Sequence, residues 1–359
     1  MKLISYCNRV IEYSFYALFF LVPLVFSGST SELFELNKMW LTFGLTAIIG
    51  TAWASKMVAQ KQFAIQKTPI DIFLLLFLAS QIISSLFSLD RHISWLGYYS
   101  RFNGGLLSTI CYVLLYYAFV SNLQIKHVLR TLLVSLASGF CVALWGFPSH
   151  FGADPTCLMF RGTFDTSCWT DAFKPTVRAF STLGQPEWLA AYMAFLLPLS
   201  LAYTLKNRTK PLISYGFLAL SVFFYLLEIF SYTRAGFLGF WIVNIIFWTA
   251  VYFKNLFPKA YFVRMLVIVN VIFLLCTFVF NAPLGSFSKY TLPELTAKAA
   301  PAATPAPTQN TAAPATPGSE LDVTDSADIR LLVWNGAVKA WENNPLFGTG
   351  VETFAFAYY

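Results

Sequence analysis

The sequence of 359 residues contains few charged side chains and only three histidines. Charged residues account for 11% of the chain, whereas soluble domains carry about 25%. Hydrophobic residues account for 57%, and the mean hydropathy is +0.62. These values exclude a soluble domain and indicate an all-α polytopic integral membrane protein.

Histidine and cysteine are too scattered to form a metal site. His92, His127 and His150 lie far apart, and no cysteine stands beside them at metal-ligand spacing. The sequence therefore predicts no metal and no cofactor. The net charge of +7 comes from cations in short loops between apolar runs, so nucleic acid is not a predicted partner. The first apolar run lacks a small-residue cleavage site and is predicted to be a retained helix.

Nine apolar runs are long enough to cross a bilayer, which takes about 20 residues. We predict about nine transmembrane helices, near residues 10–28, 39–55, 70–89, 104–121, 128–147, 188–205, 212–231, 235–253 and 265–283. With the N-terminus in the cytoplasm, five basic clusters that hold more than half of the 24 Lys and Arg residues fall in cytoplasmic segments. This distribution predicts a multi-pass protein with a cytoplasmic N-terminus.

The composition divides the chain into three predicted regions. Residues 1–285 form a transmembrane helix bundle with extracytoplasmic loops at 90–103 and 148–187. Residues 286–325 are rich in Ala, Pro and Thr and cannot bury a core, so we expect an extracytoplasmic linker. Residues 326–359 begin an extracytoplasmic loop domain.

The loop domain is predicted to open with an amphipathic helix. Asp325 or Ser326 can cap its start. Apolar residues recur at helical spacing on one face, at Ile329, Leu332, Val333, Gly336, Ala340 and Trp341. Pro345 and the turn at 348–350 end the helix.

Arginines stand in the predicted outer loops, against the positive-inside bias. Arg178 opens a stretch that turns at 184–186 and then enters a transmembrane helix. Arg234 occupies the very short turn SYTRAG, and Arg91 and Arg101 lie between the third and fourth helices. Cations above a helix N-terminus suit an anion such as a lipid-linked phosphate. Arginines that merely snorkel at the interface are the alternative.

Glu228 lies deeper in an apolar run than the other acidic residues. A carboxylate at that depth is costly unless it is paired or functional. We expect a structural ion pair with Arg234 or Arg178, and a catalytic carboxylate is the alternative.

The outer loop at 148–187 contains Cys157 and Cys168. Both face an oxidising compartment in the predicted topology, so a disulfide between them is expected. It would stiffen the approach to Arg178, and two free thiols are the alternative.

Three segments share an order, a spacing and a predicted outer location. They are Arg178…Gly184-Gln185-Pro186 with Leu189-Ala190, Tyr232-Thr233-Arg234-Ala235-Gly236, and Arg330…Trp334…Ala337…Asn344-Pro345-Leu346-Phe347-Gly348-Thr349-Gly350. In these segments the chain resembles the O-antigen ligase and polymerase superfamily of bacterial membrane glycosyltransferases, which also includes protein O-oligosaccharyltransferases.

The resemblance implies transfer of a glycan from a polyprenyl-diphosphate carrier to a lipid, polysaccharide or protein acceptor. The reaction would take place outside the cytoplasmic (inner) membrane. Arg178 and Arg234 would hold the diphosphate, because guanidinium groups match phosphate oxygens well. Supporting residues would be Arg91, Arg101, Gln185, Glu187, Glu228 and Arg330.

Two features depart from the family pattern. Glu187 follows Pro186, where the family usually has Asn, so we expect Glu187 to meet an arginine or the acceptor. The family's general-base histidine follows the Gly-Thr-Gly turn, whereas no histidine follows His150 here. We therefore expect that base beyond Tyr359, and expect residues 1–359 by themselves to bind the carrier without catalysing transfer.

Two other classes of protein would explain part of the sequence. A polytopic transporter or a lipid-linked glycan flippase would account for the helices and loop arginines, but it would more often show broken helices in matching halves. A surface-binding protein without activity would account for the linker and the last helix, but not for Arg234.

Overall fold

The computed structural model describes residues 2–30, 32–171, 173–281, 283–284, 288–299 and 326–357. Within these ranges the chain forms α-helices and one 3-10 turn, and no strand. The helices divide into two units, one of Met1–Gln66 with Leu114–Ala297, the other of Lys67–Val113 with Lys298–Tyr359. Each unit is considered by itself.

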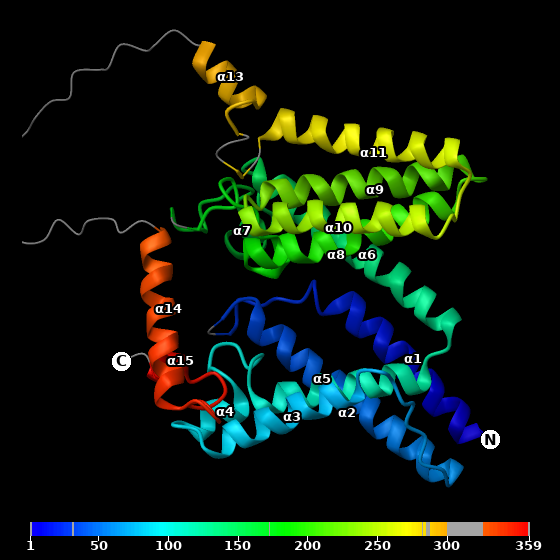
Figure 1. Ribbon diagram of the computed structural model, residues 1–359, viewed down its shortest axis with the longest axis vertical. Helices are drawn as coiled ribbons and strands as arrows, with labels where there is room; N and C mark the ends of the chain where they lie inside the picture. Colours follow the sequence, from blue (N-terminus) through cyan, green and yellow to red (C-terminus); the bar gives the residue numbers. More distant parts are fainter. Residues whose placement is uncertain are drawn as a thin grey trace, which may run out of the picture. The chain divides into compact units, whose positions relative to one another are not determined.

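The first unit is a bundle of long helices. They are α1 (Lys2–Leu21), α2 (Glu35–Gln60), α6 (Ile125–His150), α8 (Pro186–Lys206), α9 (Pro211–Phe230), α10 (Arg234–Phe253) and α11 (Lys259–Phe280). Short elements between them are α7 (Pro155–Arg161), η1 (Ser181–Leu183) and α13 (Leu292–Ala299). Helices α8, α9, α10 and α11 run side by side in Figure 1. Proline at the first position of α8 and of α9 suits a helix start, because that position needs no backbone donor.

Helix α8 forms the centre of the first unit. Its side chains Leu189, Met193 and Leu196 are fully buried. They belong to one core with Phe224 and Tyr225 of α9, and the two helices make extensive contact. Close van der Waals packing of these side chains holds α8 and α9 together, because lipid tails provide no hydrophobic driving force between membrane helices.

The second unit contains α3 (Asp71–Leu86), α4 (Arg91–Leu96), α14 (Ser326–Asn343) and α15 (Phe354–Ala357), and α5 (Leu106–Asn122) begins in it. Asp90 caps α4 by accepting the backbone N–H of Ile93 at 3.1 Å. The predicted cap Asp325 lies outside the described residues. The exposed apolar side chains of α14 include Leu331, Trp334 and Val338, so its apolar surface extends beyond the predicted face.

The helices confirm an all-α, multi-pass membrane protein. Each of the nine apolar runs coincides with a helix, and among the described residues six helices are long and apolar enough to span a bilayer. Helices α3 and α5 are apolar but shorter, so the number nine stays a prediction. Helix α1 begins at Lys2 and ends at Leu21 rather than covering 10–28. Hydropathy locates the apolar part of a helix, whereas backbone hydrogen bonding continues into polar turns.

The predicted linker at 286–325 is described only near its start. Residues 292–299 form the short helix α13, and the linker itself stays a prediction. Residues 300–325 lie outside the described residues.

Candidate diphosphate site

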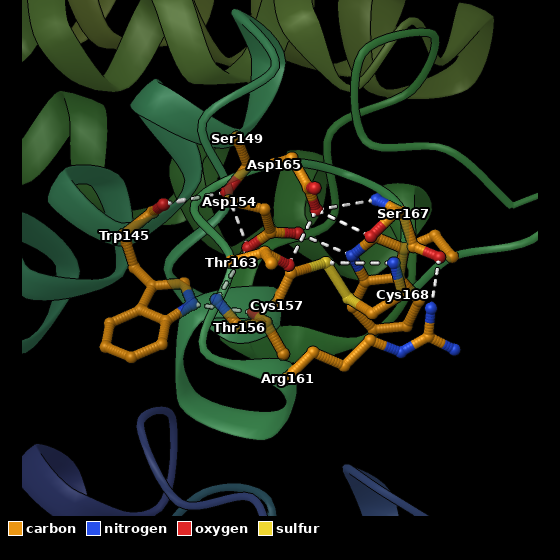
Figure 2. The surroundings of a disulfide bond; sticks show 11 residues. Trp145, Ser149, Asp154, Thr156, Cys157, Arg161, Thr163, Asp165, Ser167 and Cys168 are labelled. Carbon is orange, nitrogen blue, oxygen red and sulfur yellow. Dashed lines mark hydrogen bonds between the residues drawn. A yellow bond between two sulfur atoms is a disulfide. The ribbon is translucent and has the colours of Figure 1, made fainter.

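The loop before α8 is closed by a disulfide. Cys157 of α7 is bonded to Cys168, and their Cα atoms are 5.4 Å apart. The guanidinium of Arg161 donates to the carbonyl of Ser167 at 2.7 Å, beside the same bond. Figure 2 shows both contacts within one small loop. The disulfide and this hydrogen bond hold the segment that leads to Arg178.

Asp154 stabilises the same loop from inside. Its side chain is buried and accepts hydrogen bonds from the backbone N–H of Thr156 at 2.8 Å and from the hydroxyl of Ser149 at 3.1 Å. The indole N–H of Trp169 also donates to Asp154. This carboxylate therefore joins the end of α6, the start of α7 and the chain after the disulfide (Figure 2).

The chain then crosses to α9 and α6. The backbone N–H of Ala179 donates to the carbonyl of Phe230 at 2.8 Å. The hydroxyl of Ser181 donates to the carbonyl of Val142 at 2.6 Å. Arg178 thus enters the site on a backbone fixed to the end of α9.

The turn at 184–186 rests on α2. The ammonium of Lys38 donates to the carbonyls of Thr182 at 2.7 Å and Val25 at 2.6 Å. Gly184 has a φ of +83°, and a Cβ there would lie 2.4 Å from the ring of Phe34. Glycine is required at this position, because any side chain would be strained and would collide with that ring.

Arg178 contacts both the start of α8 and the end of α9. Its guanidinium forms an ion pair with Glu187 at 2.5 Å, and its Nε donates to the carbonyl of Ser231 at 3.4 Å. Of the two partners predicted for Glu187, the structure shows the arginine. These side chains, with Gln185 and Lys174, line an open cavity of about 250 Å³.

Lys174 contributes a second cation to the rim of this cavity. It forms an ion pair with Asp171, and its hydrogen bond lowers the pKa of the Asp171 carboxyl below the ordinary value. Asp171 is fully exposed, so solvent screens this pair strongly. The ion pair of Arg178 with Glu187 is less exposed to solvent than that of Lys174 with Asp171 and is therefore screened less.

Arg234 is the first residue of α10. Thr233 precedes it without capping the helix, since its hydroxyl is hydrogen-bonded to that of Ser231 at 3.1 Å. The backbone N–H groups of the first turn of α10 therefore have no side-chain cap and can attract an anion. Arg234 is exposed and has no ion pair among the described residues. Because Arg178 bonds to Ser231, both arginines belong to the surroundings of this turn.

The ion pair expected for Glu228 is absent from the described residues, so this prediction is wrong. Glu228 is only 2% exposed, and neither carboxylate oxygen has a hydrogen-bond partner. The rotation of α9 directs it toward α10, where a Cβ on Gly236 would lie 3.7 Å from its Oε1. Sequence spacing gives the height of Glu228 along the helix but not this rotation. Arg178 pairs with Glu187 instead.

An apolar groove lies between α8 and α10. Its volume is about 510 Å³, and Glu187 and Ala235 lie where the two helices begin. The rest of its lining is apolar: Ala191, Ala194, Phe195, Pro198, Gly236, Gly239 and Val243. The groove thus leads from the polar helix ends along the apolar length of both helices.

The other predicted supporting arginines lie in the second unit. Arg91 is the first residue of α4 and is exposed. Arg101 follows a turn in which its backbone N–H donates to the carbonyl of Tyr98 at 2.8 Å. Arg330 is exposed on α14. Their part in a common site stays a prediction.

His150 is the only histidine in the predicted outer loop at 148–187. It ends α6, and its ring stacks on Phe230 with centroids 4.0 Å apart. Its Nδ1 is buried without a hydrogen-bond partner, so this nitrogen is closed to an acceptor hydroxyl.

Sequence reasoning gave no role to Lys38 or Asp154. The Asp-Pro pair at 154–155 is a recognisable helix start, since an Asp cap often precedes a first-turn proline. Nothing local distinguishes Lys38, because its two carbonyl partners lie far away along the chain.

The long apolar helices define a multi-pass membrane protein, in which Arg178 precedes α8 and Arg234 begins α10. Residues 219–359 match the family model described as O-antigen ligase, so the chain carries a domain of the O-antigen ligase superfamily. This membership, predicted from the three motifs, supports a glycan-transfer function. The match includes Arg234 and Arg330 but not Arg178. No curated protein and no solved structure matches the chain.

Proposed function

We propose that this protein transfers a glycan from a polyprenyl-diphosphate carrier to an acceptor on the outer side of the cytoplasmic membrane. The observation that carries the proposal is the contact of Arg178 with Ser231, in the turn that presents Arg234. It joins the stretch before α8 to a motif of the matched domain.

The charges around this turn favour a diphosphate. Arg234 is exposed and unpaired among the described residues, the start of α10 has no side-chain cap, and Arg178 stands on the neighbouring carbonyl. Guanidinium groups form paired hydrogen bonds with phosphate oxygens, and a helix N-terminus adds a favourable dipole. Two cations and one helix end therefore suit a group that carries two linked phosphates.

The groove between α8 and α10 supports a long apolar chain on that diphosphate. Its lining of Ala, Gly, Phe, Pro and Val side chains has no hydrogen-bond donor to offer a polar ligand. An isoprenoid chain is surrounded by lipid at this depth, so its affinity for the groove would come from van der Waals packing against the lining. Its head would then lie at Glu187 and Ala235, beside the arginines.

In the proposed reaction an acceptor hydroxyl attacks the anomeric carbon of the glycan. The bond from that carbon to the diphosphate oxygen breaks, and negative charge develops on the leaving diphosphate. Arg178 and Arg234 would stabilise this charge. His150, whose Nδ1 is buried and whose ring stacks on Phe230, is a poor candidate for the base that takes the hydroxyl proton.

The test is an assay of the protein in detergent with a lipid-linked glycan and an acceptor. Glycan on the acceptor, with release of the polyprenyl diphosphate, would support the proposal. Movement of intact donor across a proteoliposome membrane, without bond cleavage, would identify a flippase instead. Donor binding should be measured separately from transfer, because residues 1–359 are expected to bind the donor even where they transfer nothing.

A further inference from the structure

The end of α3 and the loop after it form a receiving surface in the second unit. We call residues 87–105 the receiving loop. It contacts the turn at 344–352, which includes the Gly-Thr-Gly motif. The backbone N–H of Leu89 donates to the carbonyl of Thr349 at 2.9 Å, and the hydroxyl of Ser94 donates to the carbonyl of Val351 at 2.7 Å.

Two serines of the receiving loop act together. The hydroxyls of Ser88 and Ser94 are 2.7 Å apart, and Ser94 is fully buried. A Cβ on Gly350 would lie 2.1 Å from the Ser88 hydroxyl oxygen. Gly350 also has a φ of +115°, which side chains rarely adopt. Glycine is therefore required at position 350, because any side chain there would prevent the turn from approaching these serines.

Stacked aromatic rings and two further glycines, Gly104 and Gly105, allow the receiving loop and the turn to pack closely. The rings of Phe87 and Phe347 stack with centroids 5.2 Å apart. A Cβ on Gly104 would lie 1.9 Å from the Glu352 carboxylate, and a Cβ on Gly105 would lie 2.3 Å from the backbone nitrogen of Gly97. The receiving loop is therefore folded tightly on itself and leaves room for the turn.

We propose that the receiving loop positions the Gly-Thr-Gly turn for glycan transfer, with Ser88 and Ser94 as positioning residues. The turn lies inside the matched domain, at 219–359, whereas the receiving loop lies outside it. Residues from the N-terminal half would thus fix a segment of the transfer domain. The role in transfer rests on the proposed function, but the contact itself can be measured without it.

The contact is tested first by cross-linking. Cysteines replace Phe87 and Phe347 in the full-length protein, after its four free cysteines have been changed to alanine. A short bifunctional thiol reagent should join the pair in membranes. Ser88→Leu, which inserts a larger side chain against the turn, should reduce the yield at least five-fold. Leu89→Phe is the matched control, because that side chain is 65% exposed and its backbone bond is kept.

Transfer kinetics test the positioning role. Ser88→Leu should lower kcat about 10- to 100-fold and leave the donor KM within about two-fold, since a small misplacement is costly for reaction but not for donor binding. Ser94→Ala removes the hydrogen bond to Val351 without adding bulk, so it should give a smaller loss in kcat. It replaces Ser88→Leu in the test if the leucine variant does not fold.

The outcomes separate the inference from the proposed function. No cross-link in the parent protein, or a lost cross-link with unchanged kcat, would overturn the positioning role. Equal losses in kcat and in donor binding would also overturn it, because they would indicate general unfolding. A protein that forms the cross-link but neither binds donor nor transfers glycan would refute the proposed function and with it the role in transfer.

Discussion

The two arginine regions of the first unit are built differently. Arg178 is held by Glu187 and by a backbone carbonyl, at the end of a loop that carries a disulfide. Arg234 is the exposed first residue of α10 and follows a short turn. It has no ion pair among the described residues. Arg178 is positioned by contacts with other parts of the chain, and Glu187 offsets part of its charge. Arg234 is positioned by α10 itself, and no carboxylate among the described residues offsets its charge.

This difference predicts unequal roles toward an anion. A free guanidinium beside an uncapped helix N-terminus can meet a developing negative charge without first losing a partner. A guanidinium paired with a carboxylate must share its hydrogen bonds with the ligand. We therefore expect Arg234 to contribute more to charge stabilisation and Arg178 more to orientation.

The largest expected effect is that of Arg234→Ala. Loss of one preorganised donor to a developing anion typically costs about 10²–10³ in rate, so transfer should fall by that amount. Arg234→Lys should recover little, because an ammonium lacks the paired geometry of a guanidinium. The measurement is the rate of glycan transfer at saturating donor. Arg208→Ala, which removes a guanidinium that lies 5.7 Å from the ring centroid of Phe257, is the control. An alanine variant at Arg234 with full activity would remove the basis of the comparison.

Lys38→Met tests whether the Arg178 region depends on distant contacts. It removes two hydrogen bonds from a charged donor, each worth about 1.5–3 kcal/mol, and leaves two carbonyls without a partner. The turn at 184–186 should shift, and transfer should fall roughly 10- to 100-fold. Lys61→Met, at the exposed other end of α2, should change nothing. Equal activity of both variants would show that the turn holds its shape without Lys38.

Much of the fold could be predicted because burial in lipid leaves a strong signal. A run of about 20 apolar residues specifies a helix whatever its neighbours are. The helix ends were less predictable: α6 continues to His150 and includes Pro148. At a membrane surface a polar composition is compatible with either a helix or a loop, so composition does not show where a helix ends.

The candidate site was predictable only where its chemistry is local. Arg178 and Arg234 could be singled out because a cation is unusual in a loop that is predicted to lie outside the membrane. The unpaired state of Glu228 could not be predicted, because the direction of its side chain depends on how α9 turns against α10. The contact between Ser94 and Val351 is also invisible locally, since these residues are far apart in sequence.

Glu187→Gln is expected to improve donor binding, unlike the two substitutions above, which reduce transfer. The change removes the charge that competes for Arg178, so the donor KM should fall about two- to five-fold, in keeping with the small energy of a half-exposed ion pair. Glu228→Gln should leave the donor KM unchanged, because Glu228 pairs with neither arginine. If Glu228→Gln tightened donor binding and Glu187→Gln did not, the assignment of the ion pair would have to be reversed.

The smallest effect on transfer is expected from Cys157→Ser. The disulfide closes a short loop, with a sequence separation of 11, and should contribute about 2–3 kcal/mol to stability. Asp154 and its hydrogen bonds remain in the variant, so the folded loop should still present Arg178. Transfer at low temperature should therefore stay within about two-fold, while the Tm in detergent falls by several degrees. Asp154→Asn in the same background removes the second restraint. If the disulfide and Asp154 restrain the loop jointly, the double variant should lose far more activity than the two single variants predict, whereas simply additive losses would show that each restraint acts separately.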